Sequence, residues 1–389
     1  MRKPAKRKFG LLPRVIVAIL LGIAMGHYLP EWVTRGFATF NDLFNNFLGF
    51  MIPLIIIGLV TPAIGNIGKG AGKLLLFTVI IAYGDTILAG LFSFLTSTAL
   101  FPSLIKLGSG IKFSPEAIHG IQPYFSIPIP PMIDVMSALI FAFLLGLGIA
   151  YSYVDTLRSF FNEFQQIIAR AIKVVIIPLL PLYIMGIFMT MAATGQARRV
   201  IEMFIAIIGV IFAMHIALLL FQFCIAGSIS KTNPLKALRK MLPAYFTALG
   251  TSSSAATIPV TLKCVESCGV NRGVAGFTVP LCATIHLSGS TMKITACAIA
   301  LMLMQGSNID SATFIWFILL LGVMMVAAPG VPGGAIMAAL GVLQSVLGFD
   351  TSQQAMMIAL YIAMDSFGTA CNVTGDGAIA LLVNRINSH

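Results

Sequence analysis

Apolar stretches long enough to cross a lipid bilayer recur along almost the whole chain, and they constrain its fold more than any other feature. A helix needs about 20 residues to cross a hydrocarbon core roughly 30 Å thick. Such spans are predicted over residues 11–30, 41–65, 73–99, 131–153, 160–193 and 199–228. Hydrophobic residues make up 58% of the sequence and charged residues only 10%, which excludes an ordinary soluble domain. The pattern predicts an all-α polytopic membrane protein.

The last third of the chain has a different sequence pattern, in which small and polar residues interrupt the apolar spans. Two further spans are predicted near residues 274–304 and 352–386, each interrupted by small and polar residues, at 283–291 and 368–377. Before and between them lie apolar segments rich in Gly, Ser and Pro, at 243–262 and 311–347, and each could be a span or a re-entrant hairpin. Non-helical backbone at membrane depth must line a cavity or be buried in protein. A hairpin followed by a broken span therefore occurs twice, which indicates the inverted repeats of a secondary transporter.

The net charge of +11 reflects where basic residues stand relative to the spans, and it does not indicate a nucleic-acid partner. With two re-entrant hairpins and eight spans, the predicted inner residues are Arg2, Lys3, Lys6, Arg7, Lys8, Arg14, Lys69, Lys73, Arg158, Lys231, Lys236, Arg239, Lys240, Lys263, Arg272 and Arg385. The outer side keeps only Arg35, Lys106, Lys112, Arg198 and Arg199. This positive-inside distribution predicts that both termini are cytoplasmic. We expect a multi-pass protein of the plasma (inner) membrane, with the first span retained.

Four motifs in the last third resemble the dicarboxylate/amino acid:cation symporters, the family with the glutamate-transporter fold. They are SSSAATIPVT at 252–261, VPLCATI at 279–285, GVPGGAI at 330–336 and NVTGD at 372–376. The resemblance implies a homotrimer in which a transport domain moves against a scaffold by an elevator motion. It divides the chain into scaffold (1–70), transport domain (71–100), outer loop and scaffold (101–195) and transport domain (196–389).

The resemblance also implies which residues hold the solute and the coupling ion. Asp365 would bind the solute's amino group, and Asn372 its α-carboxylate. The other implied solute contacts are Ser252, Ser253, Ser254, Ser290, Gly330, Val331, Gly368 and Thr369, of which Gly330 and Val331 belong to the outer gate. The implied sodium ligands are the backbone carbonyls of Cys282, His286 and Asn372 and the carboxylate of Asp376, with Thr284 and Leu287 at a second site. No cofactor besides the coupling ion is expected.

Physical chemistry independently marks Asp365 and Asp376 as functional. A charged group inside a membrane span is costly unless it has a partner, so it indicates a functional site. The two aspartates are eleven residues apart, about three helical turns, and therefore project to a similar face. We expect a break at residues 372–375 to free carbonyl groups for a cation near Asp376. The alternatives are that Asp376 caps a helix and that Asp365 pairs with an intramembrane base such as Lys293.

Departures from the family pattern bear on the solute. The arginine that recognises an acidic side chain is replaced by Gly368 in the last span and by Ser252 in the first hairpin. A second solute carboxylate would then be buried without a guanidinium partner, which disfavours glutamate, aspartate and dicarboxylates. The family's NMDGT motif reads HLSGS at 286–290, so a third sodium site is expected to be absent. We expect a sodium-coupled symporter of a small neutral amino acid such as serine, threonine or alanine.

Other charged residues in the spans leave the coupling mechanism open. Asp85, His286 and Lys293 are possible coupling residues, and one alternative is a symporter of a different small solute that couples protons through His286 or Lys293. Lys293 could instead replace a cation, bind a solute carboxylate or form a structural pair with Asp85. A channel-like, uncoupled pathway is a further alternative. Serines 252–254 with Lys293 could suggest a hydrolase, but no oxyanion geometry accompanies them, so no enzyme activity is expected.

Overall fold

The computed structural model describes residues 11–67, 73–104, 121–152, 154–195, 197–328 and 332–387, and every regular element in these ranges is helical. The first half contains α1 (Leu11–Tyr28), α2 (Glu31–Ile67), α3 (Lys73–Leu104), α5 (Val135–Tyr151), α6 (Asp155–Ala171), the π-helical turn η1 (Ile172–Ile176), α7 (Ile177–Ala193) and α8 (Ala197–Ser230). These bounds agree with the predicted spans to within a few residues at most ends. Some of the predicted basic residues lie outside the described residues, namely Arg2, Lys3, Lys6, Arg7, Lys8, Lys69, Lys106 and Lys112.

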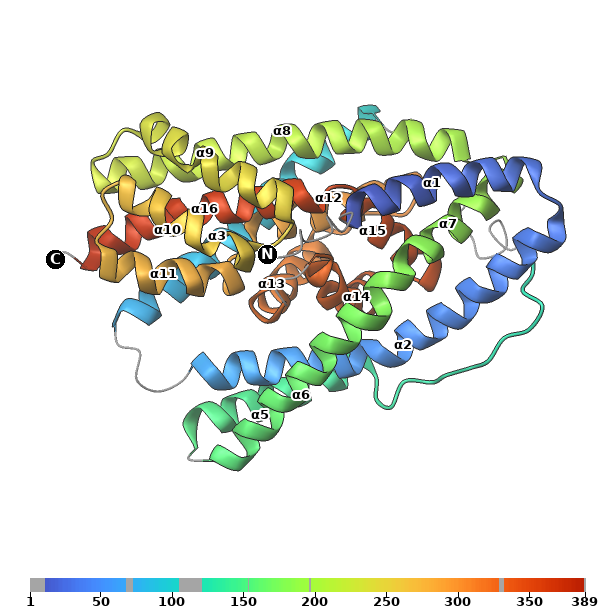
Figure 1. Ribbon diagram of the computed structural model, residues 1–389, viewed down its shortest axis with the longest axis horizontal. Helices are drawn as coiled ribbons and strands as arrows, with labels where there is room; N and C mark the ends of the chain where they lie inside the picture. Colours follow the sequence, from blue (N-terminus) through green and yellow to red (C-terminus); the bar gives the residue numbers. More distant parts are fainter. Residues whose placement is uncertain are drawn as a thin grey trace, which may run out of the picture.

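Helices α1, α2, α5, α6 and α7 pack together on one side of the molecule (Figure 1). Two glycines bring α1 and α7 into close contact, because a methyl group on Gly22 or Gly26 would overlap the backbone carbonyl of Met185 or Met189. The spacing of the pair, GxxxG, is typical of membrane helices that approach through small residues. Close backbone approach therefore fixes how these two helices cross.

The second half folds into pairs of shorter helices. They are α9 (Pro234–Thr251), α10 (Ser254–Ser267), α11 (Arg272–Ile285), α12 (Ser288–Met304), α13 (Ser311–Ala327), α14 (Gly334–Leu347), α15 (Thr351–Ala363) and α16 (Asp365–Asn387). Helices α9 and α10 lie side by side, as do α13 and α14, so each predicted hairpin segment folds as a helical pair, and its re-entry into the membrane stays a prediction. Helices α9, α10, α11 and α16 gather at the end of the molecule opposite α1 (Figure 1).

Both predicted broken spans are also present, although one of them breaks elsewhere. Helices α11 and α12 are separated at residues 286–287, inside the predicted interval. Helices α15 and α16 meet at Met364 with a bend of 63°. The expected break at residues 372–375 is wrong, because α16 continues through it. Gly375 serves close packing instead: a Cβ there would lie 2.9 Å from Gln222 Oε1 and 2.9 Å from His286 Cε1.

Length and apolar composition qualify five helical segments in the described ranges as membrane-spanning, or six if α15 and α16 form one bent span. The five are Glu31–Gly65, Leu74–Leu104, Asp155–Ala193, Ile201–Ser230 and Arg272–Met304. The apolar helices α1 and α5 are shorter, at 18 and 17 residues. At 1.5 Å per residue each is about 26 Å long, just below the thickness of a typical hydrocarbon core. The count of eight spans and the division into scaffold and transport domain stay predictions.

Candidate functional site

The two hairpins and the two broken spans converge on the first turn of α16, where Asp365 is buried. Its Oδ2 atom accepts a hydrogen bond of 2.8 Å from the amide of Gly333, at the tip of the second hairpin. Its Oδ1 atom lies 3.3 Å from the Nζ atom of Lys293 on α12. The neighbouring Ser366 hydroxyl lies 2.7 Å from the Ser252 hydroxyl at the tip of the first hairpin. Both hairpin tips therefore contact the same turn of one helix.

The first hairpin turns sharply where its serines lie. Ser252 has a left-handed backbone (φ 49°), which ends α9. Ser253 then caps α10 by accepting a hydrogen bond of 3.3 Å from the amide of Ala256, a role for which serine is strongly preferred. Ser254 begins α10 and is buried. The serine run thus forms the turn itself, and the Ser252 hydroxyl contacts α16 through Ser366.

Lys293 makes all its polar contacts within the protein. Its Nζ atom lies 3.3 Å from the carbonyl oxygen of Met364 and 3.5 Å from the centre of the Tyr361 ring, besides its contact with Asp365. A Cβ atom on Gly368 would lie 2.7 Å from the same Nζ. The alternative pairing of Asp365 with Lys293 is the one the structure contains. The proposed pair of Asp85 with Lys293 is wrong, because Asp85 contacts His286 instead.

Asn372 joins α16 to the start of α12. Its Oδ1 atom accepts hydrogen bonds from the amides of Gly289 (2.8 Å) and Ser290 (3.3 Å), and its Nδ2 atom donates to the Ser290 hydroxyl (3.1 Å). The first amides of a helix lack partners within that helix, and Leu287, which precedes α12, supplies no side-chain cap. Asn372 therefore caps α12 from another helix. Thr369 Oγ1 donates to the Asp365 carbonyl oxygen at 2.9 Å.

A second buried cluster surrounds His286, in the break between α11 and α12. The ring bridges two carboxylates: Nδ1 lies 2.9 Å from Asp376 Oδ1, and Nε2 lies 2.7 Å from Asp85 Oδ2 on α3. Gln222 on α8 donates from Nε2 to Asp85 Oδ2 (2.6 Å) and to Ser288 Oγ (3.1 Å). A neutral imidazole has a single N–H, and ionised carboxylates only accept. A neutral His286 between two ionised carboxylates can therefore form only one of the two hydrogen bonds. Both contacts are hydrogen bonds only if His286, Asp85 and Asp376 together hold one proton more than in that state.

The implied sodium ligands contain the right donor types for a hard cation, which prefers oxygen. Most of them already have a partner within the protein. The carbonyl of Cys282 accepts from the His286 amide (2.9 Å), and that of Leu287 accepts from the Thr291 amide (2.9 Å). The exposed Thr284 donates to the Leu281 carbonyl of its own helix (2.7 Å). Over the described ranges, no group of three or more His, Cys, Asp or Glu side chains is arranged to hold a metal ion.

Sequence reasoning missed two polar residues of α8 that belong to these clusters. His215 Nε2 lies 3.2 Å from the carbonyl oxygen of Gly289, and Gln222 links Asp85 to Ser288 as described above. Both are buried polar residues in an otherwise apolar span, and that could have marked them. Two predicted residues, Gly330 and Val331, lie outside the described residues.

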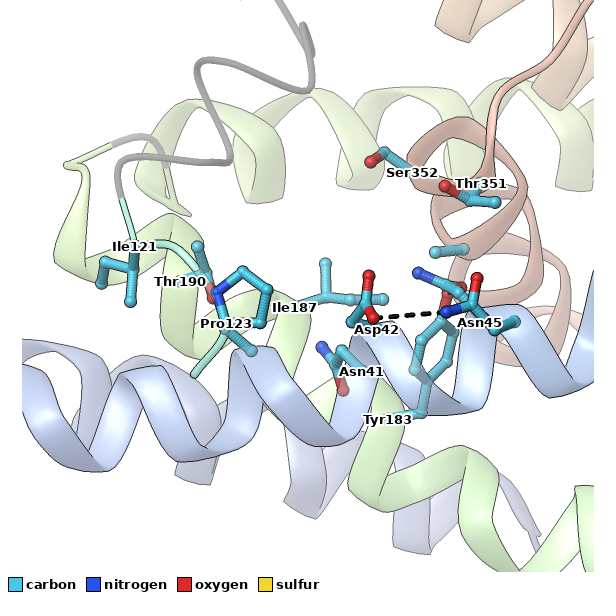
Figure 2. Close-up of a pocket in the computed structure, with 13 residues that line it drawn as sticks. Asn41, Asp42, Asn45, Ile121, Pro123, Tyr183, Ile187, Thr190, Thr351 and Ser352 are labelled. Atoms are coloured by element: carbon cyan, nitrogen blue, oxygen red, sulfur yellow. Dashed lines mark hydrogen bonds between the residues drawn. The ribbon is translucent and has the colours of Figure 1, made fainter. Parts of the chain in front are cut away.

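A separate polar cavity of about 170 Å³ lies between α2, α7 and the start of α15 (Figure 2). Its one acidic side chain, Asp42, already accepts hydrogen bonds from the Ser126 hydroxyl (2.5 Å) and from Asn46 Nδ2 (3.3 Å). Asn46 also donates to the carbonyl of Ile127 (3.0 Å). This cavity includes none of the residues around Asp365. Its polar groups attach the extended segment before α5 to α2, and it is not the candidate site.

Paired hairpins and broken helices that meet at buried charges, in a chain of apolar spans, define a secondary membrane transporter. Comparison with known proteins agrees. Residues 11–386 match the model of the sodium:dicarboxylate symporter family, and the chain belongs to that family. The family assignment confirms the resemblance seen in the sequence and excludes the hydrolase alternative, so the protein is a transporter and not an enzyme.

Similar curated proteins include two that are named serine/threonine transporter SstT. One, from Acinetobacter baumannii, is 27% identical in an alignment 388 positions long that covers 95% of each chain. Another, from Acinetobacter baylyi, is 25% identical in an alignment 395 positions long that covers 97% of this chain and 98% of the relative. The similarity therefore extends over nearly the full length of both proteins.

Proposed function

We propose that the protein is a cation-coupled symporter of a small neutral amino acid such as serine, threonine or alanine. The observation that carries this proposal is the position of Asp365. Its carboxylate is buried where both hairpin tips meet, and an ammonium group already lies 3.3 Å from it. A site that holds one ammonium group on this carboxylate is suited to hold the amino group of a solute in the same way.

The charges around the site favour a neutral solute. Lys293 is the one lysine or arginine that is buried in the described part of the chain, and its charge is balanced by Asp365. A second solute carboxylate would find no other buried cation there and would be costly to enclose. The hydroxyl groups of Ser252 and Ser366 suit a small polar side chain. The names of the Acinetobacter relatives point to the same class of solute.

Coupling is proposed to act through Asp376, with sodium as the cation. Asp376 and Asp365 lie on one helix, so a cation at Asp376 and a solute at Asp365 order the same elements. Each ligand then strengthens binding of the other, as linkage requires. A proton is the second candidate cation. The observation that favours it is the His286 ring, which already bridges Asp85 and Asp376 and needs an additional proton to do so.

The assembly and setting are proposed from the family resemblance. The protein would be a homotrimer in the plasma membrane with both termini in the cytoplasm. The transport domain would carry the solute across the membrane by an elevator motion relative to the scaffold.

Uptake of labelled amino acids by the purified protein in liposomes tests the proposal. Accumulation of serine, threonine or alanine only under an inward sodium gradient supports the sodium symporter. Accumulation under a proton gradient alone moves the coupling role to His286. Rapid uptake without saturation or accumulation indicates a channel, and no uptake of any neutral amino acid contradicts the proposed solute.

The amino-group role is tested by Asp365→Asn, which removes the charge and keeps the size of the side chain. A hydrogen bond to a charged group contributes about 1.5 to 3 kcal/mol, so we expect solute binding to weaken about 10- to 100-fold. Unchanged binding of the solute by this variant contradicts the amino-group role.

A further inference from the structure

The side chain of Lys293 is entirely buried in a helix that crosses the core of the molecule. A buried ammonium group is unfavourable unless its charge and its hydrogens are matched by partners. Here the partners are the Asp365 carboxylate, the Met364 carbonyl and the face of the Tyr361 ring. All three belong to α15, α16 or the bend between them. Lys293 is therefore built into the proposed solute site.

The space that Lys293 fills exists because residue 368 has no side chain. A Cβ on Gly368 would lie 2.7 Å from Nζ, 3.0 Å from Cε and 3.3 Å from Cδ of Lys293. These contacts are too short for any larger residue at position 368 unless the lysine moves. Gly368 and Lys293 therefore depend on each other: the ammonium group of Lys293, on α12, occupies the space that a side chain at position 368 of α16 would fill.

The Asp365 carboxylate is satisfied without any solute. One oxygen contacts the Lys293 ammonium and the other accepts the Gly333 amide of the second hairpin. The hairpin tip is therefore docked on a carboxylate whose charge is already balanced. Without Lys293, the same contact would enclose a carboxylate that has no cationic partner, which is costly.

A symporter must close twice in each cycle, once with its solute and once without it on the return step. We propose that Lys293 is an internal ligand for the amino-group position: it occupies Asp365 when the solute is absent and lets the second hairpin close over the empty site. This inference rests on the proposed function, in which Asp365 binds the solute's amino group. The solute's ammonium then competes with Lys293 for one carboxylate oxygen. A zwitterionic solute leaves the net charge of the site unchanged, which agrees with a neutral amino acid as cargo.

The test separates the return step from binding. Full-length protein carrying Lys293→Met, which removes the charge and keeps a long side chain, is reconstituted in liposomes. Exchange of labelled serine for internal serine requires only loaded forms of the transporter, whereas net uptake requires the empty form to return. We expect net uptake down the coupling-ion gradient to fall at least tenfold. Exchange should continue, with a half-saturating serine concentration several-fold lower because the competing ammonium is gone.

Lys236→Met is the matched control, because it makes the same substitution at an exposed lysine of α9 remote from the site. It should change neither measurement. Lys293→Gln, which also removes the charge, repeats the test if the methionine variant does not fold. Exchange activity itself reports that a variant is folded.

The outcomes distinguish this inference from the proposed function. Wild-type protein that neither exchanges nor accumulates a neutral amino acid contradicts the proposed function. If the wild type transports serine, a Lys293→Met variant with normal net uptake overturns the inference. A variant that loses exchange and net uptake together, with weaker serine binding, also overturns it and indicates that Lys293 contacts the solute directly.

Discussion

The amide of Gly289 and the side chain of Asn372 are joined by a hydrogen bond of 2.8 Å, although the residues are 83 positions apart. The bond connects the start of α12, just after the break in its span, to the middle of α16. The two helices approach each other closely here: a Cβ on Gly289 would lie 2.7 Å from Cys371 Cβ and 2.9 Å from the Gly368 carbonyl oxygen. The contact holds the His286 and Asp365 clusters in one arrangement.

Gly289→Ala should therefore destabilise the protein. The added methyl group must displace the backbone of α16, and overpacking of this kind typically costs about 1 to 3 kcal/mol. We expect a lower melting temperature of the purified protein and weaker serine binding. Gly209→Ala on α8 is the matched control, because nothing lies within 4 Å of a Cβ at that glycine. If Gly289→Ala melts no lower than this control, the close contact between α12 and α16 is not important for stability.

Gly333→Ala should impair closure of the second hairpin. Gly333 has φ 75°, and its amide donates to Asp365. An L-residue in this left-handed region costs about 1 to 2 kcal/mol. We expect the half-saturating serine concentration to rise about fivefold to thirtyfold, because the strain opposes the docked conformation.

Gly348→Ala controls for strain alone. Gly348 has a similar backbone (φ 68°) at the other end of α14 and open space around it. This variant should lose stability but keep the wild-type half-saturating concentration. Equal transport defects in the two variants would show that general strain, and not the Gly333–Asp365 contact, is responsible.

The sequence was sufficient to predict the helical architecture, because bilayer length and local composition determine it. Ser252 and Ser253 mark a turn, and the helix break falls at His286, inside the interval predicted from its small and polar neighbours. The same reasoning failed in the last span. There, Gly375 looks like a helix breaker in the sequence, but it allows Gln222 and His286 to pack against α16. Local sequence does not distinguish a glycine that breaks a helix from one that admits a neighbour.

The pairing of the buried charges could not be predicted. His286 contacts Asp85 across 201 positions of the chain, and Lys293 contacts Asp365 across 72. A charged residue within a predicted span implies that it has a partner of opposite charge, but the sequence offered more than one such partner, for example Asp365 or Asp85 for Lys293. Only the packing of α3 and α16 against α12 selects among them.

His286→Asn should strengthen sodium binding at Asp376. The imidazole ring fills the space between Asp85 and Asp376, and both carboxylates direct an oxygen at it. Asparagine removes the ring and adds a carbonyl oxygen, a donor type that hard cations prefer. The freed carboxylate and the new oxygen together should lower the half-saturating sodium concentration about tenfold, which corresponds to about 1.4 kcal/mol. The increase in melting temperature between potassium chloride and sodium chloride, measured for variant and wild type, reports this binding without transport. His286→Asn combined with Asp376→Asn is the control, and it should lose the added response to sodium. If His286→Asn responds to sodium no more strongly than the wild type, the ring does not compete with a cation for Asp376.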